Sequence, residues 1–181
     1  ERDEEIDLED IPQGAAREYK MMAGLKPSLF TTEVSKHATL GLNAYAQASS
    51  PIRRYLDLIN QRQILAVLRG KKPPYTVEDL QRIILYTEPL LSQALNASRQ
   101  SKRFWLLEYL RRRKKSGNDL IEGVVLRNDL RWPLVQLDEV FLKTPVRIET
   151  SKVKVGDKIK LKLLSVEPRN DYLKVTTCVK I

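Results

Sequence analysis

Cysteine and histidine are almost absent from this chain of 181 residues, where Cys178 and His37 are the single representatives of their types. One cysteine excludes an internal disulfide and favours a reducing compartment. One histidine cannot build a metal site by itself, so we expect His37 to have a structural or orienting role. No apolar run approaches the length of a membrane span, and we therefore expect no membrane partner.

Positive charge is what the chain has in excess. Lys and Arg number 32 against 23 Asp and Glu, which gives a formal net charge of +9. The first ten residues, ERDEEIDLED, run against this trend with seven acids and one arginine. We interpret residues 1–12 as a flexible acidic lead-in to a basic body, and a basic body favours a polyanionic partner. The chain opens on Glu1 rather than Met, so we expect it to be part of a longer protein.

Helices are predicted for most of the first two thirds of the chain. GAAREYKMMAGLKP is typical of a short helix that stops at Gly24 and Pro27. A stronger helix is predicted from Pro51 to Leu68. Thr76, followed three residues later by an aspartate, is a helix start signal, and a further long helix is predicted for Leu90–Lys115. We assign residues 13–117 to this mainly helical part.

After Asp119 the pattern changes from helix to strand. In KIKLKLLSV the lysines alternate with Ile159, Leu161 and Leu163, which is the period of a half-buried strand. Five short strands are predicted within about sixty residues, and they suggest a small closed barrel, of which the OB-fold is the commonest with a basic face. We therefore predict an α+β protein whose residues 118–181 form a five-stranded OB-fold barrel.

The stretch Ser50-Pro51-Ile52-Arg53-Arg54-Tyr55 raises a chemical question. Serine is a preferred N-cap and proline is favoured at the first helical position, so both arginines are expected in the first turn of a helix. The helix dipole disfavours cations there, unless a phosphate or carboxylate lies between them. Asp57 follows Arg53 by four residues and is expected to hold its guanidinium. The alternative is an arginine pair that forms ion pairs with acids of a neighbouring domain.

The residues around this stretch resemble the signature of the RNB family, the exoribonucleases of the ribonuclease II and ribonuclease R type. The resemblance lies in LGLNAYAQASSPIRRYLDLINQRQ, which contains a Leu-Gly-Leu, a tyrosine, and then the Ser-Ser-Pro-Ile-Arg-Arg-Tyr-x-Asp block in the family's order. An OB-type RNA-binding domain also follows the catalytic domain in that family. The resemblance thus implies the helical C-terminal part of an RNB catalytic domain, followed by its OB-type domain.

The resemblance implies a reaction as well as a fold. RNB enzymes hydrolyse single-stranded RNA from its 3′ end to nucleoside monophosphates and use a divalent metal, usually Mg²⁺. Arg53 corresponds to the family arginine that contacts the scissile phosphate, where a cation stabilises developing charge. Arg54 is expected to bind the neighbouring phosphate or to brace the site. Gln47 and Gln61 stand where the family often has histidine, so neither is assigned a proton-transfer role.

The metal-binding half of the family's active site is not found in this sequence. The family holds its metal with aspartates spaced like Asp-x-Asp-Asp, and Asp7, Glu9 and Asp10 do not reproduce that spacing. We interpret these three as solvated acids, and we expect the Mg²⁺ ligands outside this chain. No counterpart is found near Arg99 for the glutamate that some relatives place close to the nucleotide. The chain alone is therefore expected to bind RNA without cutting it.

RNA-binding candidates are spread over three segments: the arginine motif, the basic stretch from Arg99 to Lys115, and the strands. Basic grooves with aromatic stacking platforms bind single strands on OB-folds. In the strands the aromatic residues could equally belong to the core, and the basic helix could be an ordinary solvated one. The predicted RNA-binding residues are Ser50, Tyr55, Arg62, Arg99, Lys102, Arg103, Trp132, Lys158, Lys160, Lys162 and Tyr172.

Three functions follow in order of preference. The first is part of a 3′-to-5′ exoribonuclease that pairs with the remainder of the RNB catalytic domain, in the cytoplasm or a comparably reducing organelle stroma or matrix. The second is a non-catalytic RNA-binding module or regulator that keeps this fold. The third is a basic surface that serves protein contacts.

Overall fold

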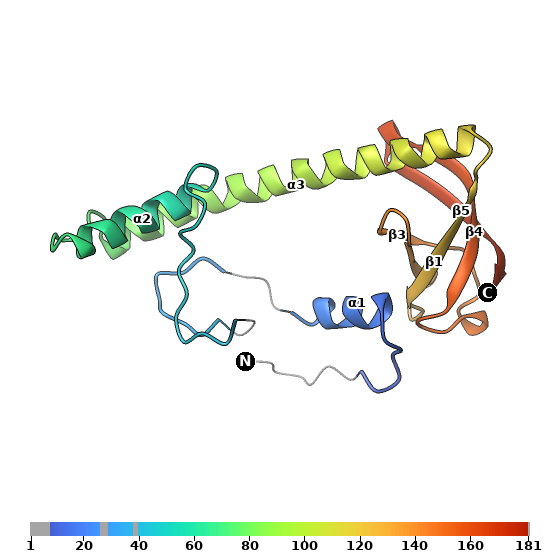
Figure 1. Ribbon diagram of the computed structural model, residues 1–181, viewed down its shortest axis with the longest axis horizontal. Coiled ribbons are helices and arrows are strands. Elements are labelled where there is room, and N and C mark those ends of the chain that lie inside the picture. The colour runs from blue at the N-terminus through green and yellow to red at the C-terminus, as the bar shows by residue number, and fades with distance from the viewer. Residues whose placement is uncertain (1–7, 26–28, 38–39, 181) are drawn as a thin grey trace. The chain divides into compact units, whose positions relative to one another are not determined.

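The computed structural model describes residues 8–25, 29–37 and 40–180. Two compact units are found, one within residues 27–95 and the other combining residues 2–26 with 96–181. Figure 1 follows the chain from blue to red through its elements. These are α1 (Ala15–Ala23), α2 (Tyr55–Leu68), α3 (Val77–Lys115), β1 (Leu120–Arg127), β2 (Leu134–Leu137), β3 (Leu142–Pro145), β4 (Lys158–Glu167) and β5 (Tyr172–Lys180), with single 3₁₀ turns at Thr150–Lys152 and Pro168–Asn170.

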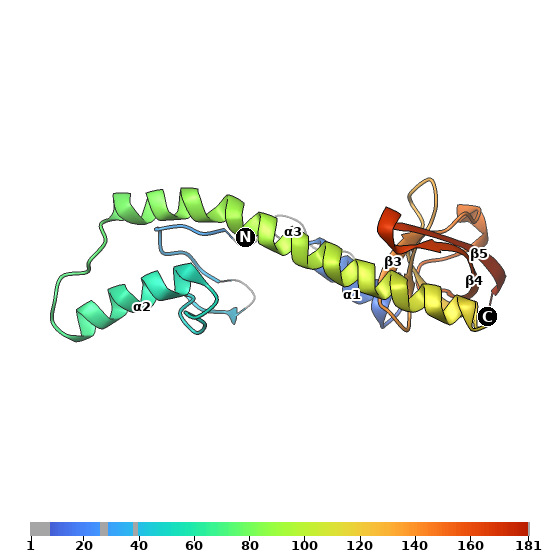
Figure 2. The same cartoon turned by 90° about the horizontal axis from the view of Figure 1, so that it is seen from above.

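The first unit is built on α2 and the beginning of α3, which run in opposite directions (Figure 2). The predicted start signal at Thr76 is confirmed. Its hydroxyl accepts the N–H of Asp79 at 3.2 Å, and the Asp79 carboxylate accepts the N–H of Thr76 at 3.1 Å. Such reciprocal capping satisfies N–H groups that a helix start leaves unpaired. Gln63 fastens the connection between the helices, because its side chain bonds both the N–H and the carbonyl of Tyr75.

Pro89 lies inside α3, and the prediction of two helices separated near this residue is wrong. α3 runs unbroken for 39 residues. Proline removes one backbone hydrogen bond from a helix interior, which costs about 3 kcal/mol. Pro89 is exposed, so water reaches the backbone there, and the hydroxyl of Thr87 donates to the carbonyl of Ile83 at 2.6 Å in the same turn. A helix of this length has enough remaining bonds to continue through one such defect.

The second unit contains an antiparallel five-stranded sheet in the order β3-β2-β1-β4-β5. Residues of β4 alternate strictly between exposed lysines and buried Ile159, Leu161 and Leu163, as the period-two pattern predicts. The α+β class and the five strands are therefore confirmed. Closure into an OB barrel stays a prediction, because the strand pairs in the described residues leave β3 and β5 as the two edges.

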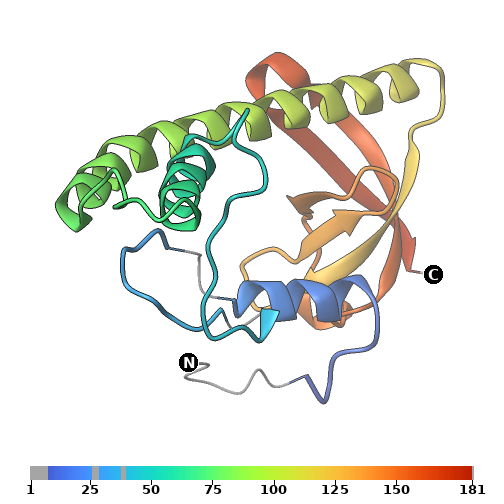
Figure 3. The same ribbon diagram turned by 60° about the vertical axis from the view of Figure 1, so that its left-hand side comes forward.

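The core of this unit lies between the sheet and the last part of α3. Leu107 and Leu110 of the helix are fully buried together with strand residues such as Val125 and Val135. Figure 3 shows the end of α3 crossing the curled sheet. α1 packs against β1 from the other end of the chain, and Ala16 is its buried residue. This docking is what brings residues near the N-terminus into the β-rich unit.

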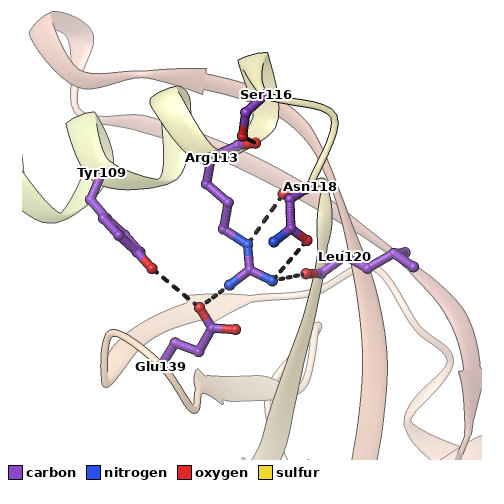
Figure 4. Close-up of polar contacts among 6 residues, drawn as sticks. All are labelled: Tyr109, Arg113, Ser116, Asn118, Leu120 and Glu139. Atoms are coloured by element: carbon purple, nitrogen blue, oxygen red, sulfur yellow. Dashed lines mark hydrogen bonds and ion pairs between the residues drawn. The ribbon is translucent and has the colours of Figure 1, made fainter.

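Arg113 connects the end of α3 to the sheet (Figure 4). Arg113 forms an ion pair with Glu139 and donates to both the backbone and side-chain oxygens of Asn118 and to the carbonyl of Leu120. Tyr109 lies within 3.5 Å of the same glutamate. Arg113 therefore has a structural role, because its donors satisfy carbonyls at the helix-to-strand connection.

The predicted change from helix to strand lies where α3 ends at Lys115 and β1 begins at Leu120. The compact units divide the chain elsewhere, near residue 95 within α3. The domain limits 1–12, 13–117 and 118–181 stay a prediction. Residues 1–7 of the acidic lead-in and Pro27 lie outside the described residues. None of the helices in the described ranges is both long and apolar enough to cross a membrane.

Candidate phosphate site and RNA-binding surface

The arginine motif forms a turn rather than the first turn of a helix. The carbonyl of Ser50 accepts the N–H groups of Arg53 at 3.2 Å and Arg54 at 3.0 Å, and α2 begins only at Tyr55. Arg54 is the N-cap residue, with an extended backbone. The predicted helix start at Ser50 and Pro51 is thus wrong by four residues. Its physical reason is a carboxylate of α2, which draws Ser50 into a turn.

That carboxylate belongs to Asp57, which is completely buried. Its Oδ2 accepts the N–H of Ser50 at 2.8 Å and the Nη2 of Arg54, also at 2.8 Å. Arg54 Nη2 also donates to the hydroxyl of Ser49 at 3.0 Å. Spacing predicts that Asp57 holds Arg53, but the structure pairs it with Arg54. A buried carboxylate bound in this way fixes both the turn and the neighbouring guanidinium.

Arg53 is left with an exposed side chain. Within the described residues, its guanidinium takes part in none of the ion pairs or side-chain hydrogen bonds found at this turn. The two adjacent arginines therefore differ: one is anchored by its own chain, and the other is available to a phosphate or carboxylate from outside. The sequence alone did not separate them, because both stand next to the same aspartate.

The side chains of Asn60 and Gln61 on α2 hold the segment that precedes the motif. Asn60 donates to the carbonyl of Gln47 at 2.9 Å, and Gln61 donates to the carbonyl of Ala48 at 2.7 Å. Gln61 thus positions the backbone of Ala48. Both bonds fix the backbone just before Ser50 and thereby support the turn that leaves Arg53 exposed.

His37 and Arg62 are occupied by local contacts. The Nδ1 of His37 accepts the N–H of Leu40 at 3.3 Å, and its ring meets the ring of Tyr45 edge-on, with centroids 4.9 Å apart. Arg62 donates to the hydroxyl of Tyr75 at 2.8 Å, a bond that raises the pKa of Arg62. Within the described residues, neither is found in contact with Arg53. Tyr55 is exposed at the start of α2.

The candidates of the second unit fall into separate groups. Arg99 and Lys102 are exposed on α3, while Arg103 forms an ion pair with Asp171. Tyr172 is exposed at the start of β5, beside that aspartate in the chain. These residues keep the accessibility that RNA contact requires, with Arg103 partly neutralised by its partner.

The lysine row on β4 is less positive than its sequence suggests. Lys160 lies 4.0 Å from a carboxylate oxygen of Glu122, and Lys162 lies 3.3 Å from Asp119. Burial raises the pKa of the carboxyl of Asp138, and the charge of Lys158 opposes that rise. The pairing of β1 with β4 places Glu122 opposite Lys160, whereas Asp119 lies just before β1 and Asp138 just after β2. Such cross-strand neighbours cannot be read from the alternation within one strand.

Trp132 has two cationic neighbours. The guanidinium carbon of Arg131 lies 5.6 Å from the centre of its ring, and that of Arg147 lies 5.9 Å away. Arg131 is the neighbour of Trp132 in the sequence, whereas Arg147, which follows β3, was not among the predicted residues. The signal for Arg147 is the alternation along β3 and beyond, where Lys143 and Arg147 share the exposed side. Cations at this distance from an indole attract its ring and concentrate positive charge there.

No group of three or more His, Cys, Asp or Glu side chains that could hold a metal ion is found in the described part of the chain. Asp7, one of the three acids considered above, lies outside that part. Mg²⁺ prefers several hard oxygen ligands in near-octahedral geometry, and the described acids do not supply them. The described residues therefore do not fit a magnesium site, and none of them is assigned a reaction step at a metal.

Comparison with known proteins identifies the motif. Residues 6–70 match the model of the RNB domain, and this range includes the turn of Arg53 and all of α2. An uncharacterized ribonuclease of Synechocystis is 37% identical over 171 residues, a match that covers 93% of this chain and 25% of the relative. The chain thus spans about a quarter of the length of that relative. The resemblance to the RNB family that the sequence suggested is confirmed.

Solved structures show the same fold. The Dss1 exoribonuclease of Candida glabrata, in an active-site mutant form, has a TM-score of 0.76 at 22% identity, covering 91% of this chain and 21% of that one. Mycoplasma genitalium RNase R in complex with ribose-methylated single-stranded RNA has a TM-score of 0.67 at 16% identity, covering 92% of this chain and 30% of that one. At these identities the likeness establishes the fold.

Proposed function

Since residues 6–70 of this chain belong to the RNB family, we propose that the chain is part of a 3′-to-5′ exoribonuclease that hydrolyses single-stranded RNA to nucleoside monophosphates. It contributes RNA binding and the arginine of the scissile phosphate. The observation that carries this proposal is the turn at Ser50, which anchors Arg54 on buried Asp57 and leaves Arg53 exposed. Relatives that are named as ribonucleases favour an enzyme over a non-catalytic module.

Arg53 acts on the phosphoryl group. Its planar guanidinium donates two parallel N–H bonds to phosphate oxygens and stabilises the charge that grows on them during attack by water. Arg54 acts as a brace, because its ion pair with Asp57 holds the backbone on which Arg53 stands. The fixed turn spares Arg53 the ordering cost that a flexible loop would impose in the transition state.

In this proposal, Mg²⁺ is bound by other parts of the enzyme. We assign its ligands to parts of the protein outside this chain, and none of the described residues is given a share in holding it. The partner of the first unit is then the remainder of the RNB catalytic domain. The exposed apolar side chains of the first unit fit that expectation. Those more than 70% exposed are Val34, Ile52, Leu85 and Tyr86. Large exposed apolar surface is typical of an interface.

The second unit supplies RNA contacts in this proposal. The candidates are the exposed cations Arg99 and Lys102, Tyr172 at the start of β5, and Trp132 with its two arginines. The β4 lysines are assigned a smaller share because acids face them. A single cysteine suits the cytoplasm, or an organelle stroma or matrix of similar reducing character.

The test is a substitution in the full-length enzyme. Arg53→Ala is expected to lower kcat by roughly 100- to 1000-fold, as the loss of one transition-state donor does. The Kd for single-stranded RNA is expected to change by less than about threefold, since one phosphate contact among many is lost. Arg82→Ala, another exposed arginine, is the control and is expected to leave both quantities unchanged. Equal losses in kcat and RNA affinity would reduce Arg53 to a simple binding residue.

A further inference from the structure

A groove of about 490 Å³ lies between α3 and the connection from β4 to β5. All of its lining residues belong to the second unit, so its shape depends on one compact body. The helix contributes Phe104, Trp105, Glu108 and Arg112, and the 3₁₀ turn opposite contributes Pro168 and Arg169. None of these side chains is used by the phosphate site at Arg53 or by the lysine row of β4.

Trp105 is the aromatic surface of this groove. Its side chain is 62% exposed, although Leu107 and Leu110 on the same helix are fully buried. Phe104 meets the indole edge-on, with ring centres 5.2 Å apart and planes at 86°. An edge-to-face pair of aromatic rings is favourable, so Phe104 helps to hold the indole. The exposed part of Trp105 is the surface that remains open to a flat ligand.

Glu108 organises the cations beside it. Its carboxylate accepts Arg111 at 2.6 and 2.8 Å and Arg112 at 2.8 Å. These bonds lower the pKa of Glu108 to about 2, so the carboxylate remains charged at any ordinary pH. One acid thus orients two arginines and neutralises only one of them. Glu167 also lines the groove, so its two acids face the three cations Arg111, Arg112 and Arg169, and net positive charge remains next to the indole.

Arg112 and Arg169 are placed to use that charge. Arg112 bonds Glu108 through its Nε, and its side chain is 73% exposed. Within the described residues, no ion pair of its two terminal nitrogens is found. Arg169 is exposed on the opposite wall. Two guanidinium groups that line one groove with an exposed indole match a ligand with a planar base and a phosphate.

We propose that this groove binds one nucleotide of single-stranded RNA, with its base stacked on Trp105 and its phosphate held by Arg112 and Arg169. The inference rests on the proposed RNA binding, but it places a contact away from the scissile phosphate. The groove lies further along the helix that carries the exposed cations Arg99 and Lys102. An RNA strand that binds these cations can therefore continue into the groove. An acidic protein segment is the competing occupant, and it has no base to stack.

The two tryptophans of the chain allow a direct test, because each can be removed to leave the other as the only emitter. In the Trp132→Phe variant, fluorescence reports on Trp105 alone. Titration with a short end-labelled uridylate oligomer follows binding by the anisotropy of the label and stacking by the tryptophan emission. A matched oligomer with the same phosphates and no bases supplies the comparison.

The proposal expects the emission of Trp105 to fall along the same binding curve as the anisotropy, and to stay unchanged with the abasic oligomer. If anisotropy shows binding while the emission stays constant, the groove is not a nucleotide site and the RNA-binding function stands. If anisotropy does not rise even at low salt, the proposed RNA binding fails and the groove proposal fails with it. The Trp105→Phe variant, which leaves only Trp132, shows whether the two indoles respond separately.

Single-charge variants test the phosphate contact. Arg169→Gln and Arg112→Gln are each expected to weaken RNA binding several-fold and to reduce the slope of log affinity against log salt by about 0.7, the share of one phosphate on a single strand. Arg82→Gln on the same helix removes one charge outside the groove and is the control. Arg169 holds none of the ion pairs found in the described residues, so its variant remains informative if Arg112→Gln disturbs Glu108. Unchanged slopes for both variants would overturn the phosphate contact.

Discussion

At the scale of single residues, the structure separates two arginines that the sequence treats alike. Both were expected in a helical turn with Asp57 beneath Arg53. Instead, the buried carboxylate takes Arg54 and the N–H of Ser50, and Arg53 is left exposed. The residue types predicted charged contacts at this turn, but they did not predict which residues pair. A shift of four residues in the helix start changes which side chains meet. The chemistry at Arg53 depends on this difference.

Removing the charge of Asp57 should loosen the turn without touching Arg53. Asp57→Asn is expected to leave Arg54 partly buried with a weaker partner and to destabilise the turn by about 1–3 kcal/mol, the cost of a broken buried hydrogen bond. Hydrogen exchange at the Ser50 amide, measured by NMR, is expected to become faster. Asp171→Asn, in an exposed pair with Arg103, is the control and should leave that amide unchanged. Equal protection of Ser50 in both variants would contradict the role of Asp57.

Glu108 predicts a particular response to acid. Its pKa in the folded chain is about 2, below its usual value, because Arg111 and Arg112 bond to it. A lowered pKa means that Glu108 stabilises the fold above the unfolded pKa and that this contribution disappears as pH falls toward 2. Glu108→Gln should therefore lower the Tm at neutral pH, and the difference from the parent chain should shrink between about pH 4.5 and 2.

The control for this pH series is Glu88→Gln, which changes an exposed glutamate on the same helix. It is expected to leave the difference in Tm near zero at every pH. A difference for Glu108→Gln that does not depend on pH would show that its ion pairs do not stabilise the fold.

At the scale of helices and strands, local patterns predicted most elements and missed their pairings. The alternation of β4, the capping signal at Thr76 and the stop of α2 at Leu68 were all readable, because each depends on neighbours in the chain. The acids opposite the β4 lysines were not, since they come from another strand and the intervening loop. The docking of α1 on β1 joins segments that are far apart in the sequence, and no local pattern encodes it.

The pairing of β1 with β2 requires a glycine at position 123. A Cβ at Gly123 of β1 would lie 2.7 Å from the carbonyl oxygen of Gln136 and 2.8 Å from a methyl group of Val135. Gly123→Ala is therefore expected to push β1 from β2 and to destabilise the second unit by about 1–3 kcal/mol. Urea unfolding measures this. Leu120→Ala, at an exposed position of the same strand, is expected to cost much less, and equal costs would contradict the close approach of the strands.

At the scale of the whole molecule, the chain combines a motif of the RNB domain with a β-rich unit, and it spans about a quarter of the curated relative described above. The fold of solved exoribonucleases covers nearly all of it. The described residues include Arg53 as a candidate phosphate-binding residue. Among them, no group of side chains that could hold a metal ion is found. For the whole molecule we propose that this chain binds single-stranded RNA and that cleavage requires the complete enzyme.

One measurement tests that account most directly: the affinity of this chain for end-labelled single-stranded RNA across a series of salt concentrations, with Mg²⁺ present and the length of the RNA checked afterwards. The account predicts binding that weakens linearly in log salt, with a slope of about −0.7 for each phosphate contact, and RNA of unchanged length. RNA affinity that is absent at low salt or indifferent to salt would contradict it. Stepwise shortening of the RNA would contradict the division of labour, because the chain would then cut by itself.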